Sequence, residues 1–108
     1  MSNLMRITKD NFATEVVAAA VPVLIDFGAD WCAPCKKLAP IVEDLAKRYS
    51  GRLKVGYVDV GKDQALAADY KVMSVPTLLF FKGGKVVRQL TGFRPADELE
   101  TALEEVLG

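Results

Sequence analysis

The sequence contains no histidine and only two cysteines among its 108 residues. Without histidine, the chain lacks the most common general base, the Cys–His nucleophile pair and most zinc and haem ligand sets. Two cysteines alone do not complete a four-ligand zinc site, so we expect no metal site. Any covalent chemistry must therefore come from the two cysteines and a few carboxylates.

The sequence also lacks an excess of charge and a long hydrophobic run. Fourteen basic residues balance fourteen acidic ones, so electrostatics give no reason to expect a nucleic-acid or anionic-membrane partner. The longest apolar stretch, residues 16–25, is interrupted by Pro22, whereas a membrane-spanning helix needs roughly 20 residues. The first six residues do not form the basic start of a signal peptide. We therefore expect a cytoplasmic protein without a membrane partner.

Length and composition predict a single domain over residues 1–108. Hydrophobic residues make up 51% of the chain and charged residues 26%, which is enough apolar material for one core. Apolar periodicity predicts helices over residues 8–20, 35–49, 64–70 and 95–107, and strands over residues 5–7, 21–27, 53–60, 77–82 and 85–91. Thr8 is the expected cap of the first helix, Pro40 should kink the second, and Gly83-Gly84 should close a hairpin. This order predicts an α/β fold, with a central mixed β-sheet flanked by helices on both faces.

The two cysteines lie three positions apart, where the apolar central strand meets the kinked helix. A structural disulfide over so short a loop would add only about 2 kcal/mol of stability, which favours redox chemistry over an inert or metal-sharing pair. Cys32 precedes the helix, where free backbone N–H groups and the helix dipole stabilise a thiolate. Cys35 lies one turn further in and is expected to be more buried. Cys32 is therefore the predicted nucleophile and Cys35 the predicted resolving thiol, with Pro34 restricting the backbone between them.

Further motifs accompany the cysteine pair: residues 27–36, which include Trp31-Cys32-Ala33-Pro34-Cys35, and Pro40, Asp26, Ser74-Val75-Pro76-Thr77, Lys82-Gly83-Gly84 and Gly92. Together these residues resemble the active site of the thioredoxin family. These match the order and spacing of the family over essentially the whole chain. The resemblance implies the thioredoxin fold and reduction of protein disulfides by reversible Cys32–Cys35 dithiol/disulfide exchange.

The resemblance also implies partners and an electron source. No cofactor would be bound, and electrons would come from NADPH through a flavoprotein, thioredoxin reductase. The other partners would be diverse disulfide-containing proteins, and the protein would be a monomer. Trp31, Ala33, Pro34 and Pro76 would support the active site.

Asp26 and Pro76 have roles in this resemblance, each with an alternative. Asp26 is the one polar residue in an apolar strand, where burial would raise its pKa, and the matching residue of the family helps to take the proton from Cys35. A solvent-facing edge carboxylate is the alternative. The Val75–Pro76 bond would be cis, with the backbone of Val75 pairing with an extended substrate. An ordinary trans proline at the start of a strand is the alternative.

Trp31 and Gly92 are the further candidates for substrate binding. We expect the Trp31 ring to be partly exposed and to contact partners, whereas the alternative is a core aromatic. Gly92, together with Gly84, would leave a flat docking surface, unless it only ends a strand. For Lys36 and Lys37, a solvated helix face and an effect on the thiolate explain their positions equally well.

Three positions differ from the usual pattern of the family. Ala33 stands where glycine is commonest, Gly28 where tryptophan is frequent, and Tyr57 where many members carry a lysine near the buried aspartate. We expect a modest effect of Ala33 on the redox potential, looser packing beside Gly28, and a higher pKa for Asp26 because the cation is missing.

Two other functions stay open. A binding subunit of a larger complex, without turnover, is the main alternative to the reductase, and the intact cysteine pair favours the reductase. An oxidant or isomerase of an oxidising compartment is the third. The Ala-Pro dipeptide between the cysteines, in place of one that contains histidine, argues against it.

Overall fold

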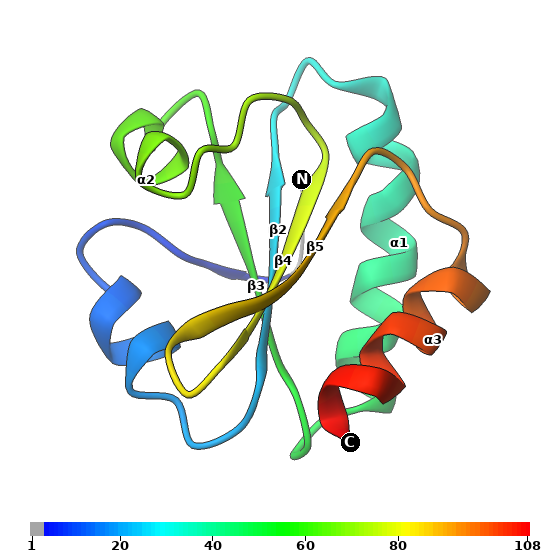
Figure 1. Cartoon of the computed structure of the whole chain (residues 1–108). Helices are drawn as coiled ribbons and strands as arrows, with labels where there is room; N and C mark the ends of the chain where they lie inside the picture. Colours follow the sequence, from blue (N-terminus) through cyan, green and yellow to red (C-terminus); the bar gives the residue numbers. More distant parts are fainter. Residues whose placement is uncertain (1–3) are drawn as a thin grey trace.

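Five strands form one mixed sheet in the order β1-β3-β2-β4-β5 (Figure 1). The structure is a computed structural model and describes residues 4–108. The strands are β1 (Met5–Arg6), β2 (Val23–Gly28), β3 (Lys54–Asp59), β4 (Thr77–Lys82) and β5 (Lys85–Thr91). β3 runs parallel to β1 and β2, whereas β4 runs antiparallel to β2 and β5. The predicted mixed sheet is thus confirmed, with β2 at its centre.

Helices cover both faces of this sheet. The long helices α1 (Ala33–Arg48) and α3 (Ala96–Leu107) lie together on one face, at the right of Figure 1. The short π-helix η1 (Ala13–Val17) and helix α2 (Gln64–Asp69) cover the opposite face. No helix within residues 4–108 has the length and apolar character that crossing a bilayer requires.

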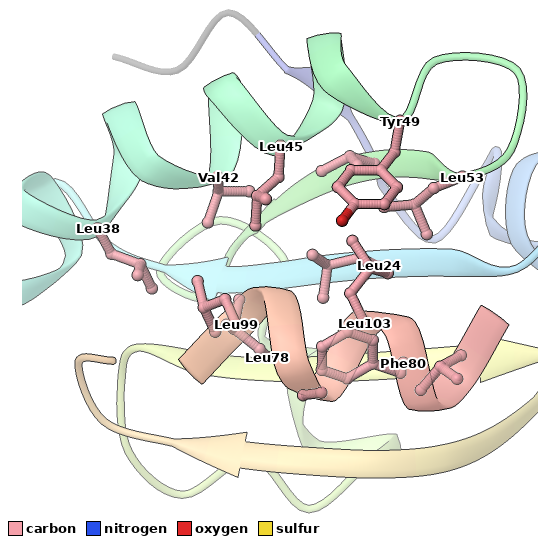
Figure 2. Packing of buried hydrophobic residues seen from close by; sticks show 13 residues of the cluster. Leu24, Leu38, Val42, Leu45, Tyr49, Leu53, Leu78, Phe80, Leu99 and Leu103 are labelled. Carbon is pink, nitrogen blue, oxygen red and sulfur yellow. The ribbon is translucent and has the colours of Figure 1, made fainter. Parts of the chain in front are cut away.

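The alternating side chains of β2 divide the core into two layers. Leu24 faces α1 and α3, whereas Ile25 and Phe27 face η1 and α2, and all six residues of the strand are buried. Figure 2 shows the first layer, whose buried members include Leu24, Leu38, Val42, Leu45, Leu78, Phe80, Leu99 and Leu103. A strand that is apolar on both faces is therefore the central strand, as the sequence predicts.

Helix α1 begins at Ala33, two residues before the predicted start. Cys32 is its N-cap, and Pro34 lies in the first turn, where a missing backbone N–H costs nothing because it would have no intrahelical partner. The helix runs on through Pro40, which is exposed. The earlier start places Cys35 inside the first turn.

The predicted first helix over residues 8–20 is confirmed only over Ala13–Val17, where η1 forms, and its predicted extent is wrong. The backbone N–H of Thr8 donates to Asn11 Oδ1 at 2.7 Å, and its hydroxyl accepts from the N–H of Asp10 at 3.2 Å. These bonds close a local turn, so Thr8 does not cap a helix. Side-chain bonds of this kind compete with helix formation.

The other elements form where they are predicted, with small differences at their ends. Both strands of the hairpin match at each end, and the turn glycines Gly83 and Gly84 have φ of 62° and 80°. Two positive φ angles in a two-residue turn match the twist of a hairpin. The strand predicted over residues 21–27 covers 23–28, and the last helix begins after Pro95, which is its N-cap.

We predict that Gly56→Ala destabilises the fold, because β3 has no room for a side chain there. A Cβ at Gly56 would lie 2.5 Å from Cγ1 of Ile7 and 3.3 Å from Cδ1 of Ile25, and both isoleucines are buried. The expected loss is about 2 kcal/mol in the free energy of unfolding, measured by denaturant melts. Adding Ile7→Ala should remove more than half of that loss. An equal loss in both backgrounds would show that Ile7 is not the obstacle.

Candidate active site

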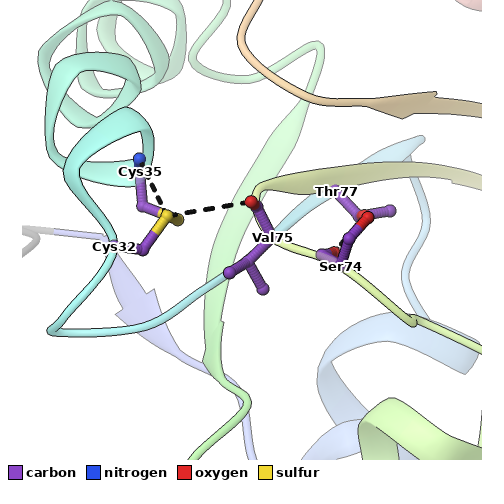
Figure 3. Close-up of a disulfide and its surroundings, with 5 residues drawn as sticks. All are labelled: Cys32, Cys35, Ser74, Val75 and Thr77. Carbon is purple, nitrogen blue, oxygen red and sulfur yellow. Dashed lines mark hydrogen bonds between the residues drawn. A yellow bond between two sulfur atoms is a disulfide. The ribbon is translucent and has the colours of Figure 1, made fainter.

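The cysteine pair lies beyond the C-terminal end of the central strand β2, where α1 begins. Cys32 and Cys35 form a disulfide, with their Cα atoms 5.3 Å apart. The backbone N–H of Cys35 donates to Sγ of Cys32 at 3.2 Å, as a side-chain cap of the helix (Figure 3). When the disulfide is reduced, the same N–H and the positive end of the α1 dipole favour a thiolate on Cys32.

The loop before β4 lies directly beside the disulfide. Sγ of Cys32 is 3.8 Å from the carbonyl oxygen of Val75 (Figure 3). The Val75–Pro76 bond is cis, as the family resemblance implies. The Thr77 hydroxyl donates to the carbonyl of Ser74 at 2.7 Å, which holds the loop closed before the strand. The backbone of Val75 thus lies next to Sγ of Cys32, the N-cap residue of α1.

Gly92, which follows the last residue of β5, lies beside the Val75–Pro76 segment. Its N–H donates to the carbonyl of Pro76 at 2.8 Å, its φ is +90°, and a Cβ there would meet nothing within 4 Å. Gly84, by contrast, lies at the other end of the hairpin, where its Cβ position is 3.2 Å from Val17. The prediction that the two glycines share one surface is therefore wrong, because β4 separates Pro76 from the hairpin turn.

The cysteines do not differ in burial as predicted. Cys32 is 3% exposed and Cys35 5%, because both pack with Ala29, against Val60 and Val75. Exposure in the disulfide form therefore does not separate a nucleophile from a resolving thiol. Their positions in the helix differ, since Cys32 is the N-cap and its sulfur accepts the N–H bond of Cys35.

Exposed apolar side chains surround the buried pair. Trp31 is 75% exposed, which excludes a core aromatic, and Ala33 and Pro34 are also exposed. Sequence reasoning missed Met73, which is 92% exposed and precedes the Ser74–Val75 segment. It also missed Phe93, which follows Gly92. Nζ of Lys37 lies over the Phe93 ring, 5.6 Å from the ring centroid. The position of each residue next to a matched motif was the available clue.

Asp26 is buried in the middle of the sheet, at 2% exposure. Its neighbours are Tyr57 on β3 and Leu78 on β4, so the alternative of a solvent-facing edge carboxylate is excluded. Burial raises the pKa of Asp26 to about 7, and its Oδ1 has no hydrogen-bond partner among the described residues. Such a carboxyl group can hold or release a proton near neutral pH.

Gly28 is not a place of looser packing, contrary to the prediction. A Cβ there would lie 3.1 Å from Cε1 of Tyr57 and 3.5 Å from Sγ of Cys35. The ring of Tyr57 therefore fills the space that a side chain at Gly28 would need. Burial, with the nearby carboxylates, raises the pKa of Tyr57 to about 12.

The cysteine pair supplies the thiol–disulfide chemistry of this site. No group of three or more possible metal-ligating side chains occurs within residues 4–108. The geometry brings together a dithiol pair, a buried carboxyl group and an exposed backbone segment. This arrangement can exchange a disulfide with an extended peptide chain.

Comparison with known proteins agrees with this chemistry. A family model described as Thioredoxin matches residues 3–105. The chain is 39% identical over 104 residues to "Thioredoxin C-2" of Corynebacterium nephridii, covering 96% of each chain. It is 40% identical over 107 residues to "Thioredoxin 1" of Nostoc sp., covering 99% of this chain and all of the relative. It is 38% identical over 103 residues to "Thioredoxin" of Alicyclobacillus acidocaldarius, covering 95% and 97%.

We predict that Asp26→Asn stabilises the oxidised protein above neutral pH. The pKa of Asp26 is about 7 in the folded protein and about 3.9 when unfolded. The folded state thus binds the proton more tightly, and stability falls as the pH rises from about 4 to about 7. Above that range the cost of the buried charge is about 4 kcal/mol. The amide removes the charge but is itself buried, so we expect a net gain of about 1–3 kcal/mol at pH 8, vanishing towards pH 4.

Denaturant melts of the oxidised protein between pH 4 and pH 9 measure this difference. Asp30→Asn is the matched control, since it makes the same substitution at an exposed aspartate just before α1. The control should show no comparable gain. A loss of stability in Asp26→Asn at pH 8 would mean that the native carboxylate is well solvated or hydrogen-bonded.

Proposed function

The chain belongs to the thioredoxin family, and from this membership we propose that Cys32 is the nucleophile and Cys35 the resolving thiol of a protein-disulfide reductase. Thioredoxins are thiol–disulfide oxidoreductases, and the Cys32–Cys35 pair is the redox-active disulfide of this one. The observation that carries the assignment is the hydrogen bond from the N–H of Cys35 to Sγ of Cys32. It favours negative charge on Cys32 and not on Cys35.

The first step joins the protein to its target. The Cys32 thiolate attacks one sulfur of a target disulfide, a mixed disulfide forms, and the other target sulfur leaves as a thiolate that takes a proton from water. Cys32 needs no base in this step, because the helix end already favours its ionised form.

The second step releases the reduced target. Asp26 takes the proton of the Cys35 thiol, and the resulting thiolate attacks Sγ of Cys32. The second target sulfur leaves and is protonated, and the Cys32–Cys35 disulfide forms. Two electrons pass from the dithiol to the target. A carboxyl group with a pKa of about 7 is suited to accept this proton near neutral pH.

Target binding is assigned to the residues around the sulfur. The backbone of Val75, beside the cis Pro76, would pair with an extended target segment, as a strand added to an edge. Trp31 would contact the target with its exposed ring, and Gly92 would keep the neighbouring surface free of a side chain. Backbone pairing tolerates many target sequences.

Reduction of the disulfide requires an electron donor. The family implies a thioredoxin reductase, which we propose to be a flavoprotein that draws electrons from NADPH, and a cytoplasmic location suits this reducing function. The test is NADPH oxidation coupled to a protein disulfide such as insulin, with and without a thioredoxin reductase. Reduction only with the reductase present supports the proposal. A Cys32–Cys35 bond that chemical thiols reduce readily, with no turnover by any reductase, would favour a binding subunit of a larger complex.

We predict that replacing each cysteine by serine stops the reaction at a different step. Cys32→Ser should form no mixed disulfide, whereas Cys35→Ser should form one with the target and hold it, because no second thiol can displace it. Gel analysis after acid quench, with and without reductant, identifies the trapped species. Faster alkylation of Cys35 than of Cys32 in the reduced protein would reverse the assignment.

A further inference from the structure

Tyr57 and Cys35 flank Gly28 on the sheet face under α1. The Cβ position of Gly28 is 3.1 Å from Cε1 of Tyr57 and 3.5 Å from Sγ of Cys35. The ring edge and the sulfur therefore both border the space that a side chain at Gly28 would occupy. Asp26 precedes Gly28 by two residues and pairs directly with Tyr57 across parallel strands, so all these groups share one face.

Two buried side-chain oxygens within residues 4–108 have no hydrogen-bond partner, and both belong to this cluster. They are Oδ1 of Asp26 and the hydroxyl oxygen of Tyr57. A buried polar group without a partner costs free energy, so each such group needs an explanation. The other tyrosine on this face, Tyr49, does have a partner, since its hydroxyl donates to Glu104 at 2.7 Å.

We propose that Tyr57 is a positioning residue for the resolving step: its ring fills the space beside Gly28, and its hydroxyl is the hydrogen-bond donor for the negative charge that Cys35 and Asp26 exchange. The proposal rests on the function assigned above to these two residues. In the disulfide form Cys35 carries no thiolate, and the hydroxyl of Tyr57 does not bond to the Asp26 carboxyl group either. The proposed hydrogen bond therefore forms only after the disulfide is reduced. When the pair is reduced, one negative charge moves between the Cys35 thiol and the Asp26 carboxyl group.

A tyrosine hydroxyl suits this role because it donates a hydrogen bond without adding a charge. The thiolate and the carboxylate are acceptors only, and a donor favours whichever of them is ionised. The titratable and charged groups around Tyr57 are Asp26, Asp30, Asp59 and Arg6, together with Cys35 across Gly28. Since burial and the three carboxylates raise the pKa of Tyr57 to about 12, the hydroxyl stays protonated throughout the working range.

Tyr57→Phe tests the hydroxyl while keeping the ring. We expect the pH midpoint of the resolving step to rise by about one unit, so that decay of the mixed disulfide slows about tenfold below the midpoint. Single-turnover reduction of insulin between pH 5 and pH 9, stopped with acid, measures this decay. The denaturant midpoint of the oxidised variant should not fall, because the hydroxyl has no partner in that form. An unchanged pH profile would overturn the proposal.

Tyr70→Phe is the matched control, because it removes a hydroxyl from the opposite face, where Tyr70 packs against Phe12 and Phe81. Its pH profile should equal that of the parent. Gly28→Ala supplies a second readout, since its methyl group would push the Tyr57 ring. It should slow the resolving step in the parent and add little in Tyr57→Phe. Equal slowing in both backgrounds would mean that the ring does not place the hydroxyl, and would overturn the proposal.

Asp26→Asn and Cys35→Ser in the same series separate this inference from the function on which it rests. If Asp26→Asn leaves the resolving rate unchanged, or Cys35→Ser holds no mixed disulfide, the assigned function is wrong. If both behave as assigned while Tyr57→Phe keeps the parent profile, only the role of Tyr57 is wrong.

Discussion

The packing of α1 across the centre of the sheet is the contact on which the site depends. Leu38, Val42 and Leu45 are buried against the β2 face that carries Leu24, and full burial of each such side chain contributes about 1.5–3 kcal/mol. That stripe fixes the rotation of the helix about its axis, whereas the Cys32 cap and Pro34 mark where it starts. Cys35 lies three residues before Leu38 on the same stripe, so its sulfur faces Gly28. The apolar pattern that holds the core together therefore also aims the sulfur of Cys35 at Gly28.

The same packing explains why a carboxyl group is tolerated at Asp26. The side chain lies on the α1 face of the central strand, out of contact with water, and burial is the cause of its raised pKa. A protonated carboxyl group is much cheaper to bury than an ion. Because its pKa is about 7, the group is partly ionised at neutral pH and can serve as a proton acceptor. The ionised carboxyl group thus lowers the stability of the fold at the position where we propose a proton transfer, and the apolar layers on both faces of the sheet offset that loss.

The sequence predicted correctly those strands and turns that depend on residues close together in the chain. The central strand follows from an apolar run on both faces, and the hairpin from Gly83-Gly84, whose backbone takes the required positive φ. The helix expected over residues 8–20 starts only at Ala13, because Thr8 and Asn11 bond to nearby backbone and to each other. The cis bond before Pro76 came from family resemblance alone. The equal burial of the cysteines depends on Val75, distant in sequence, and no spacing within the Cys-x-x-Cys segment reveals it.

Gly28 and Tyr57 show why departures from a family pattern must be interpreted in pairs. Taken singly, Gly28 predicts looser packing beside the active site, and Tyr57 predicts only that the family's lysine near Asp26 is missing. The parallel register places Tyr57 beside Asp26, two residues before the pair that Gly28 makes with Asp59, so the ring leans into the space that the glycine leaves. The small residue and the large one therefore compensate in volume across two strands. They do not compensate in charge, because a hydroxyl is neutral where an ammonium group would lower the pKa of the carboxyl group. The pKa of Asp26 is then set by burial, and the chemistry beside Cys35 relies on a neutral donor in place of a cation.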